Sequence, residues 1–187
     1  MFKRTKFLSI LTLVFIVTIV LANCAPLSQL GSARAITIAV VDDSESSSGR
    51  PNAQSIYSGA WLAVQEFNDQ TSGFNINLVP YGDESDPKIA QQVAEQIAKS
   101  QAVAVIGHST NEAAMAAGAV YNQAEIPFLS VNPTTAQLTR DYPYAFRVMY
   151  TAEQEAVYLA TYLRKIQGQD KASIIFTDDQ YGTALKK

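Results

Sequence analysis

Hydroxyl and amide side chains gather in two loops, each of which follows an apolar run and leads into a helix-like segment. The first loop spans residues 107–111 (GHSTN) and the second spans residues 130–135 (SVNPTT). Free backbone amides at a helix N-terminus, beside small polar side chains, form a ready site for an anion such as a carboxylate. The helix dipole adds about 0.3–2 kcal/mol there, and each charge-assisted hydrogen bond adds roughly 1.5–3 kcal/mol. Helix capping alone explains either loop, but the two loops together predict a ligand site.

The same residues offer little to catalysis or metal binding. His108 is the single histidine, so the sequence does not favour a histidine metal cluster or a Ser-His-Asp triad. We expect His108 to line the ligand cleft or to cap a helix. Asp42 and Asp43 resemble the acid pair of phosphorylatable receiver domains, but a receiver needs a further aspartate where Gly107 and His108 stand. We interpret both carboxylates as solvated loop groups. No G-x-G-x-x-G follows the first apolar run, which argues against nicotinamide binding. The sequence predicts a binding protein with no cofactor and no metal.

Charge excludes nucleic acid as a partner. The chain has 14 basic and 17 acidic residues. Removing the three basic residues Lys3, Arg4 and Lys6 of the first segment leaves 11 basic against 17 acidic residues, which is not the basic footprint that nucleic acid requires. Hydrophobic residues make up 48% of the chain, enough for the packed core of one domain of ordinary size.

The elements that position these loops follow from apolar patterning. Continuous apolar runs predict strands buried on both faces, and strict alternation predicts a half-buried strand. The expected strands are 36–41, 74–80, 103–106 and 126–130. Helical spacing of apolar residues predicts helices over 54–70, from the Asp86-Pro87 start through Ile97, and over 112–124. Strands that alternate with helices in this way predict a doubly wound parallel α/β sheet with helices on both faces.

The last third of the chain has a different pattern. Residues 144–148 predict a fifth strand, and Thr151 with Gln154 predicts a capping box for the following helix. Residues 173–176 predict another buried strand, and a helix begins after Tyr181. We therefore expect residues 36–150 to form ligand-binding lobe 1, and residues 151–187 to form the crossover and the beginning of an incomplete lobe 2.

The N-terminal segment, residues 1–23, has the pattern of a secretory signal peptide. Lys3, Arg4 and Lys6 form its basic part, and Phe7–Leu21 runs without a charge. This apolar stretch is shorter than the ~20 residues that a membrane-spanning helix needs. We expect the chain to be exported, and an uncleaved membrane anchor is the alternative.

Cys24 is the only cysteine, so no intramolecular disulfide forms. Residues 21–24 (LANC) resemble a bacterial lipoprotein signal, in which the cysteine becomes the lipidated first residue, although Asn23 departs from the usual small residue. Residues 24–35 then form a tether that holds the lobe at the membrane surface. We expect a lipid-anchored protein in the periplasm or at the outer face of the cytoplasmic membrane. Ordinary cleavage near Cys24 is the alternative.

Several stretches occur in the order found in periplasmic leucine/isoleucine/valine-binding proteins. They are 81–87 (YGDESDP), 105–108 (VIGH), 126–130 (IPFLS) followed by Thr134 and Leu138-Thr139, Phe146-Arg147 and 179–182 (DQYG). Over about residues 36–187 the chain therefore resembles this family, the type I periplasmic binding proteins that serve ABC transporters. The resemblance implies a lobe with flavodoxin-like strand order and a chain truncated after that first lobe.

The resemblance also implies site residues. Asn111 aligns with a serine that contacts the ligand carboxylate, and Tyr181 aligns with a tyrosine that faces the ligand. The candidate ligand-binding residues are Asn52, His108, Asn111, Ser130, Asn132, Pro133, Thr134 and Tyr181. Asn111 replaces the family's serine and Pro133 removes an amide donor, so a polar amino acid, an amide or a urea-like solute is expected as well as a branched-chain amino acid.

Two functions remain open on the sequence. The chain is a receptor lobe that binds a small amino acid or amide-like solute in an interlobe cleft and delivers it to an ABC permease in the membrane. The alternative is a truncated or membrane-tethered single-lobe module that serves interaction, or is a remnant, and binds no ligand tightly. The missing half of the receptor distinguishes the two, because the resemblance implies an acidic residue on lobe 2 that neutralises the ligand ammonium and a closure of both lobes that buries the ligand.

Overall fold

The computed structural model describes residues 34–42, 55–71 and 73–186. Residues Ala35–Lys187 form one compact unit, and Met1–Arg34 form another. The predicted signal peptide, Cys24 and Asn52 lie outside the described residues. The account below concerns the unit that begins at Ala35.

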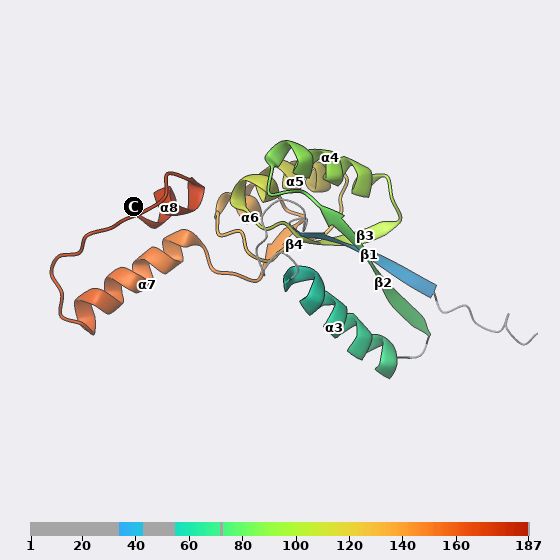
Figure 1. Cartoon of the computed structure of the whole chain (residues 1–187), viewed down its shortest axis with the longest axis horizontal. Coiled ribbons are helices and arrows are strands. Elements are labelled where there is room, and N and C mark those ends of the chain that lie inside the picture. The colour runs from blue at the N-terminus through green and yellow to red at the C-terminus, as the bar shows by residue number, and fades with distance from the viewer. Residues whose placement is uncertain (1–33, 43–54, 72, 187) are drawn as a thin grey trace, which may run out of the picture. The chain divides into compact units, whose positions relative to one another are not determined.

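Five strands form one sheet in the order β2-β1-β3-β4-β5 (Figure 1). They are β1 (Arg34–Asp42), β2 (Phe74–Gly82), β3 (Ala102–Gly107), β4 (Phe128–Ser130) and β5 (Ala145–Arg147). The pairs β1–β3, β3–β4 and β4–β5 run parallel. Gly107 lies opposite Ser130, and Ser130 lies opposite Arg147, so the carboxyl ends of three strands meet at one edge. The predicted α/β class and flavodoxin-like strand order are confirmed.

Helices cover both faces of this sheet. They are α3 (Ser55–Gln70), α4 (Pro87–Ala98), α5 (Asn111–Gln123), α6 (Gln137–Asp141), α7 (Ala152–Lys165) and α8 (Gln180–Leu185). α4 and α5 pack side by side on one face, and α3 lies on the opposite face (Figure 1). The short helix α6 was not predicted, because five residues with no side-chain cap leave little periodicity to read.

The core lies between the α4–α5 pair and the sheet. Small side chains on both helices are fully buried, which lets the helices approach closely: Ala90, Ala94, Ala113, Ala114 and Ala117. The larger side chains of Tyr121, Phe128 and Leu138 fill the remaining space. The ring centroids of Tyr121 and Phe128 are 5.2 Å apart and the ring planes are tilted by 55°, a favourable aromatic geometry.

Two helix starts that the sequence predicts are present. The Asp86 carboxylate accepts hydrogen bonds from the amides of Lys88 and Ile89, at 2.8 and 3.1 Å, and Pro87 follows it. The Thr151 hydroxyl accepts from the Gln154 amide at 3.2 Å, while the Gln154 side chain accepts from the Thr151 amide at 2.9 Å. The predicted capping box of α7 is therefore confirmed.

The predicted strand over residues 173–176 is wrong. Residues 171–177 have no regular structure, and Ile174, Ile175 and Phe176 are exposed. A strand needs a neighbouring backbone for its hydrogen bonds, and no strand in the described ranges pairs with this segment. The apolar run has the composition of a buried strand without the partner that would bury it.

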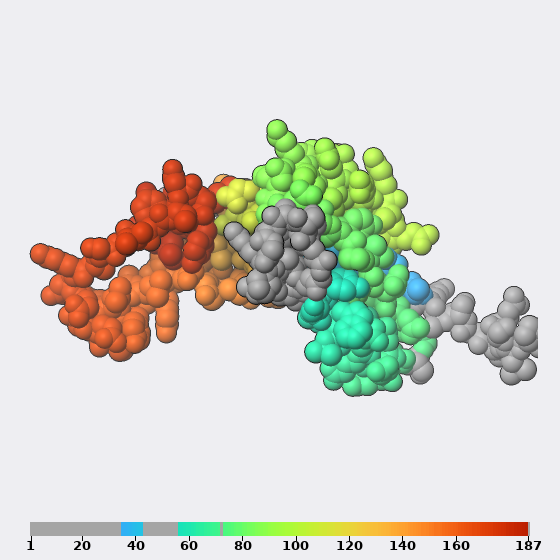
Figure 2. All heavy atoms as spheres, in the orientation of Figure 1, coloured from blue at the N-terminus to red at the C-terminus, as the bar shows by residue number. Residues whose placement is uncertain are grey.

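Exposed apolar side chains also mark α7 and α3. On α7, Val157 and Tyr158 are each about two thirds exposed, and so is Ile166, which caps the C-terminal end of that helix. Figure 2 shows the orange atoms of α7 uncovered and the cyan atoms of α3 standing out from the surface. On α3, Ile56 is buried while Leu62 is exposed. Among the helices of the described ranges, none is both long and apolar enough to cross a membrane.

Candidate functional site

A glycine shapes the end of β3. Gly107 has φ +141°, and a Cβ atom on it would lie 2.1 Å from the carbonyl oxygen of Val41 in β1. Only glycine adopts this backbone without strain and permits so close an approach. The chain can therefore turn directly from β3 into the loop that begins α5.

Asn111, the first residue of α5, joins the two predicted loops. Its side-chain oxygen accepts hydrogen bonds from the amides of Thr134 and Thr135, at 2.7 and 3.0 Å. Asn111 is 7% exposed. Because both bonds come from backbone donors, the loop after β4 is held against the N-terminus of α5. The structure brings together the two loops that the sequence singled out.

Two hydroxyl groups, one at the end of β4 and one in the loop after it, have unmet hydrogen-bonding capacity. Ser130 Oγ and Thr134 Oγ1 are buried and have no hydrogen-bond partner among the described residues. The backbone of Thr134 is engaged, since its carbonyl accepts from the amide of Ala152 at 3.0 Å. A buried polar group without a partner costs roughly 1–3 kcal/mol, so a ligand group that reached Thr134 Oγ1 would recover part of that cost.

A pocket of about 430 Å³ opens beside these loops. Its wall includes Asn111, Asn132, Pro133, Thr134 and Tyr181. Pockets for small ligands measure about 300–1,000 Å³, so an amino acid fits the available space. Five of the predicted site residues thus meet around one pocket, at the edge of the sheet where open parallel sheets bind ligands.

The pocket wall is acidic. Glu112, Glu155 and Asp179 line it, and among the described residues no Lys or Arg does so. Glu155 Oε2 accepts a hydrogen bond from the Tyr181 hydroxyl at 3.2 Å, and Asp179 Oδ1 accepts from the Gly182 amide at 2.7 Å. The Gly182 amide and the Thr177 hydroxyl hold the pKa of Asp179 below its usual value. Burial, together with the bond to Glu155, raises the pKa of Tyr181.

The acidic side chains were not among the predicted site residues. Asp179 stands in the 179–182 stretch, where only Tyr181 was singled out. Glu155 lies in the first turn of α7, where an acidic residue also fits the helix dipole. Each acidic residue could be explained by its place in the sequence without a ligand, so neither was predicted to be part of the site.

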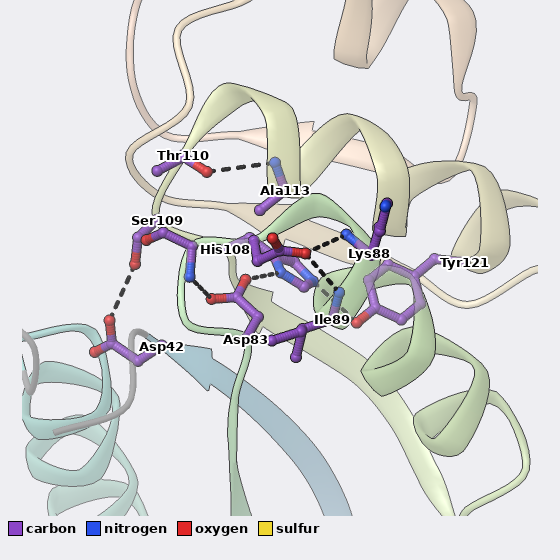
Figure 3. A network of polar contacts seen from close by, with 11 residues as sticks. Asp42, Asp83, Lys88, Ile89, His108, Ser109, Thr110, Ala113 and Tyr121 are labelled. Carbon is purple, nitrogen blue, oxygen red and sulfur yellow. Dashed lines mark hydrogen bonds and ion pairs between the residues drawn. The ribbon is translucent and has the colours of Figure 1, made fainter. Parts of the chain in front are cut away.

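His108 does not line the pocket. It is fully buried, with Nδ1 2.5 Å from Asp83 Oδ2 and Nε2 3.1 Å from the Tyr121 hydroxyl (Figure 3). Its ring also meets the Phe128 ring edge-on, with centroids 5.6 Å apart. The expectation that His108 lines the cleft or caps a helix is corrected, because both ring nitrogens find polar partners inside the lobe. Ser130 is fully buried as well and is not part of the pocket wall.

Asp42 is not a solvated loop group, contrary to the interpretation from the sequence. It is 8% exposed, and its carboxylate accepts from the Ser109 hydroxyl at 3.1 Å and from the Ile56 amide at 3.2 Å. Figure 3 shows Asp42 at the end of β1 reaching Ser109. Asp42 therefore ties β1 and α3 to the loop after β3. In the described part of the chain, no group of three or more His, Cys, Asp and Glu side chains is placed to hold a metal ion.

Comparisons with known proteins agree with this fold. The Leu/Ile/Val-binding protein of Escherichia coli (strain K12) is 27% identical over 172 residues, which cover 89% of this chain and 47% of that protein. An amino acid binding protein of Pseudomonas aeruginosa is 30% identical over 131 residues, 68% of this chain and 35% of that protein. The crystal structure of an ABC transporter substrate-binding protein from Desulfitobacterium hafniense in complex with Leu has a TM-score of 0.70 at 31% identity.

The D. hafniense match covers 82% of this chain and 45% of that one. The chain thus spans about half the length, or less, of the relatives it matches. A family model described as periplasmic binding protein matches residues 35–187. Such a match covers the sheet, all the described helices and the pocket, and the family consists of extracytoplasmic binding proteins rather than enzymes. The chain belongs to the periplasmic binding protein family.

Proposed function

We propose that this chain supplies a ligand-binding lobe of an ABC transporter's solute-binding protein. It holds a small amino acid or amide-like solute and delivers it to a permease in the membrane. The observation that carries the proposal is the joint made by Asn111, which fixes the loop after β4 against the start of α5 beside an acidic pocket. The leucine complex of the D. hafniense relative supports an amino acid as the ligand class.

The polarity of the pocket suits a zwitterion. Helix geometry leaves the amides of Asn111 and Glu112 without a partner inside α5, and we assign the ligand carboxylate to them and to the Thr134 hydroxyl. The ligand ammonium then faces Glu155 and Asp179, on the acidic side of the pocket. One ligand with both charges satisfies both sides, whereas a simple anion would face uncompensated carboxylates.

The side-chain specificity of the proposed site is broader than branched-chain amino acids. Met149 and Tyr150 offer apolar surface to the pocket, while Asn111 and Asn132 offer amides. Pro133 supplies no amide donor. We therefore include polar amino acids, amides and urea-like solutes in the ligand class.

The expected affinity is modest. A micromolar dissociation constant corresponds to about −8 kcal/mol. If the described residues provide half of the contacts of such a site, about −4 kcal/mol remains, which is a millimolar constant. Binding by this chain therefore has to be sought at millimolar ligand.

We further propose that the protein is exported by a signal peptide over residues 1–23 and anchored by a lipid on Cys24, with residues 36–150 as lobe 1 and residues 151–187 as the crossover into lobe 2. Growth with a labelled fatty acid should label the wild-type protein and not the Cys24→Ala variant. An unlabelled wild-type protein would show that Asn23 prevents lipoprotein processing.

One observation favours the second candidate function, a tethered interaction module without tight ligand binding. Val157 and Tyr158 on α7 are 67% and 68% exposed. Large contiguous apolar patches mark protein–protein interaction sites, and these two side chains would contribute to such a patch. In that case α7, and not the pocket, would carry the function.

Equilibrium dialysis of the full chain tests the proposal, with labelled L-leucine, L-glutamine and urea as probes at 0.1–10 mM, roughly the range that the affinity estimate requires. Thr134→Val removes only the hydroxyl, which has no partner among the described residues. We expect this variant to keep its melting temperature and to bind the preferred probe roughly 3- to 10-fold more weakly, the value of one hydrogen bond. Unchanged affinity in both Thr134→Val and Asn111→Ala would refute the assigned site.

A further inference from the structure

A buried network of polar side chains joins three elements of the lobe. Asp83 directly follows β2, His108 directly follows β3, and Tyr121 lies in α5. All three side chains are 99% or more buried. Asp83 Oδ2 lies 2.5 Å from His108 Nδ1, and His108 Nε2 lies 3.1 Å from the Tyr121 hydroxyl (Figure 3). Nothing in the proposed ligand contacts uses these groups.

One arrangement of protons satisfies each hydrogen bond of this network. A carboxylate only accepts, so His108 Nδ1 must carry a proton to bond Asp83. Asp83 Oδ1 is occupied by the Ser85 amide at 3.0 Å. Burial, with the nearby Asp83 charge, raises the pKa of Tyr121, so its hydroxyl keeps its proton and can donate to Nε2. Every group in the network is then satisfied, as buried polar groups require.

His108 directly precedes the loop residues that line the pocket, so the network that holds His108 also restrains that loop. The next three residues, Ser109, Thr110 and Asn111, supply the first-loop wall of the pocket. On the other side of His108, Gly107 has a positive φ that glycine adopts without strain. Ser109 is tied to Asp42, and the Asp83 amide donates to the Asp42 carbonyl at 3.3 Å. The loop is therefore held from two ends of one network.

We infer that His108 is a positioning residue for the ligand loop, held through Nδ1–H by Asp83 and through Nε2 by Tyr121, so that residues 109–111 keep the geometry that the pocket needs. The inference rests on the proposed function for its purpose, but the positioning itself is a property of the ligand-free chain. It assigns a role to a side chain that touches no ligand.

The test uses the single histidine of the chain. With ¹⁵N-histidine in the full chain, long-range ¹H–¹⁵N spectra at neutral pH show which ring nitrogen carries the proton. We expect a proton on Nδ1, alone or together with one on Nε2. A ring protonated only on Nε2 would overturn the inference, because the bond to Asp83 would then lack its proton.

A pair of tyrosine variants tests the consequence for the loop. Tyr121→Phe removes one oxygen and keeps the ring that packs on Phe128. Tyr142→Phe is the control, a partly buried tyrosine that also packs beside α5, near Gly118. Without ligand, we expect Tyr121→Phe to raise amide hydrogen exchange at residues 109–111 roughly 2- to 10-fold, the value of one hydrogen bond, and Tyr142→Phe to leave it unchanged. Equal exchange in both variants overturns the positioning role.

A second pair keeps the test independent of folding and of the proposed function. His108→Asn retains a donor near the Nδ1 position and should keep residues 109–111 closer to wild-type exchange than His108→Ala does. If both histidine variants fail to fold, the tyrosine pair and the ring spectrum still decide. If wild-type protein binds neither L-leucine nor L-glutamine, the proposed function fails, while the ligand-free exchange data still support or overturn the positioning of the loop.

Discussion

Helices α5 and α7 have the same kind of N-cap, but α5 is largely buried and α7 is largely exposed. Each has a threonine N-cap: Thr110 accepts from the Ala113 amide at 3.3 Å, and Thr151 accepts from the Gln154 amide at 3.2 Å. Six residues of α5 are buried, whereas Ala152 alone is buried in α7. Both helices therefore have a complete N-cap, and their difference in burial does not come from the way they start.

The difference lies in what faces each helix. α5 packs on α4, and its small side chains lie against the core, so it can hold the pocket loops in place. α7 carries larger apolar side chains, and those of Val157 and Tyr158 remain exposed. Most helix stability in proteins comes from packing of an apolar face. Changes near α5 should therefore cost far more than equivalent changes in α7.

The largest effect is expected at the turn that leads into α5. Gly107→Ala places a Cβ atom 2.1 Å from the Val41 carbonyl oxygen at φ +141°, and the combined strain and overpacking should lower the free energy of unfolding by at least ~3 kcal/mol. Urea denaturation measures the loss. Gly59→Ala in α3 is the control, since nothing lies within 4 Å of its added Cβ, and it should stabilise by roughly 0.5–1 kcal/mol.

A matched leucine pair compares the two surroundings directly. Leu138, which packs near Gly118 of α5, is 0% exposed, and Leu163 in α7 is 38% exposed. Leu138→Ala should cost about 2–5 kcal/mol of unfolding free energy, the usual loss for a buried leucine, and Leu163→Ala should cost less than about 1 kcal/mol. Similar losses for the two variants, measured by urea denaturation, would contradict the contrast between the helices.

Asn111→Ala should come next in size. It removes the acceptor for two backbone amides that hold the loop after β4, so the free energy of unfolding should fall by roughly 1–3 kcal/mol. Faster hydrogen exchange at the amides of Thr134 and Thr135 should accompany the loss. Exchange that stays at the wild-type rate would show that this joint does not hold the loop.

The smallest effects are expected at the two N-caps. Loss of a threonine cap costs about 1 kcal/mol of helix stability. Thr110→Ala should lower the global free energy of unfolding by about this amount, because α5 is part of the cooperative core. Thr151→Ala should reduce the helix content measured by circular dichroism but change the global free energy of unfolding little, because only Ala152 of α7 is buried. A global loss from Thr151→Ala as large as that from Thr110→Ala would place α7 in the core.

Features that depend on neighbours in the chain were predicted well. The Asp86 cap and the capping box at Thr151 follow from short-range hydrogen bonds, whereas the expected strand order came from the family resemblance. The meeting of the two polar loops was predicted because parallel strands bring their carboxyl ends to one edge of a sheet.

Features that depend on residues far away in the sequence were not predicted. The inward turn of His108 requires Asp83 and Tyr121, which are 25 and 13 residues away. Burial of Asp42 requires Ser109, which is 67 residues away. Residues 173–176 have the composition of a buried strand, but composition cannot supply the neighbouring strand that pairing requires.

The most direct test of the central claim is a backbone ¹H–¹⁵N titration of the full chain with L-leucine and, separately, L-glutamine up to a few tens of millimolar, roughly ten times the expected dissociation constant. The proposed site predicts saturable shifts at the amides of residues 109–112 and of Thr134, with Glu155 and Tyr181 following the same curve. Saturable shifts confined to α7, or no saturable shift with either amino acid, would contradict the assignment of this pocket as the ligand site.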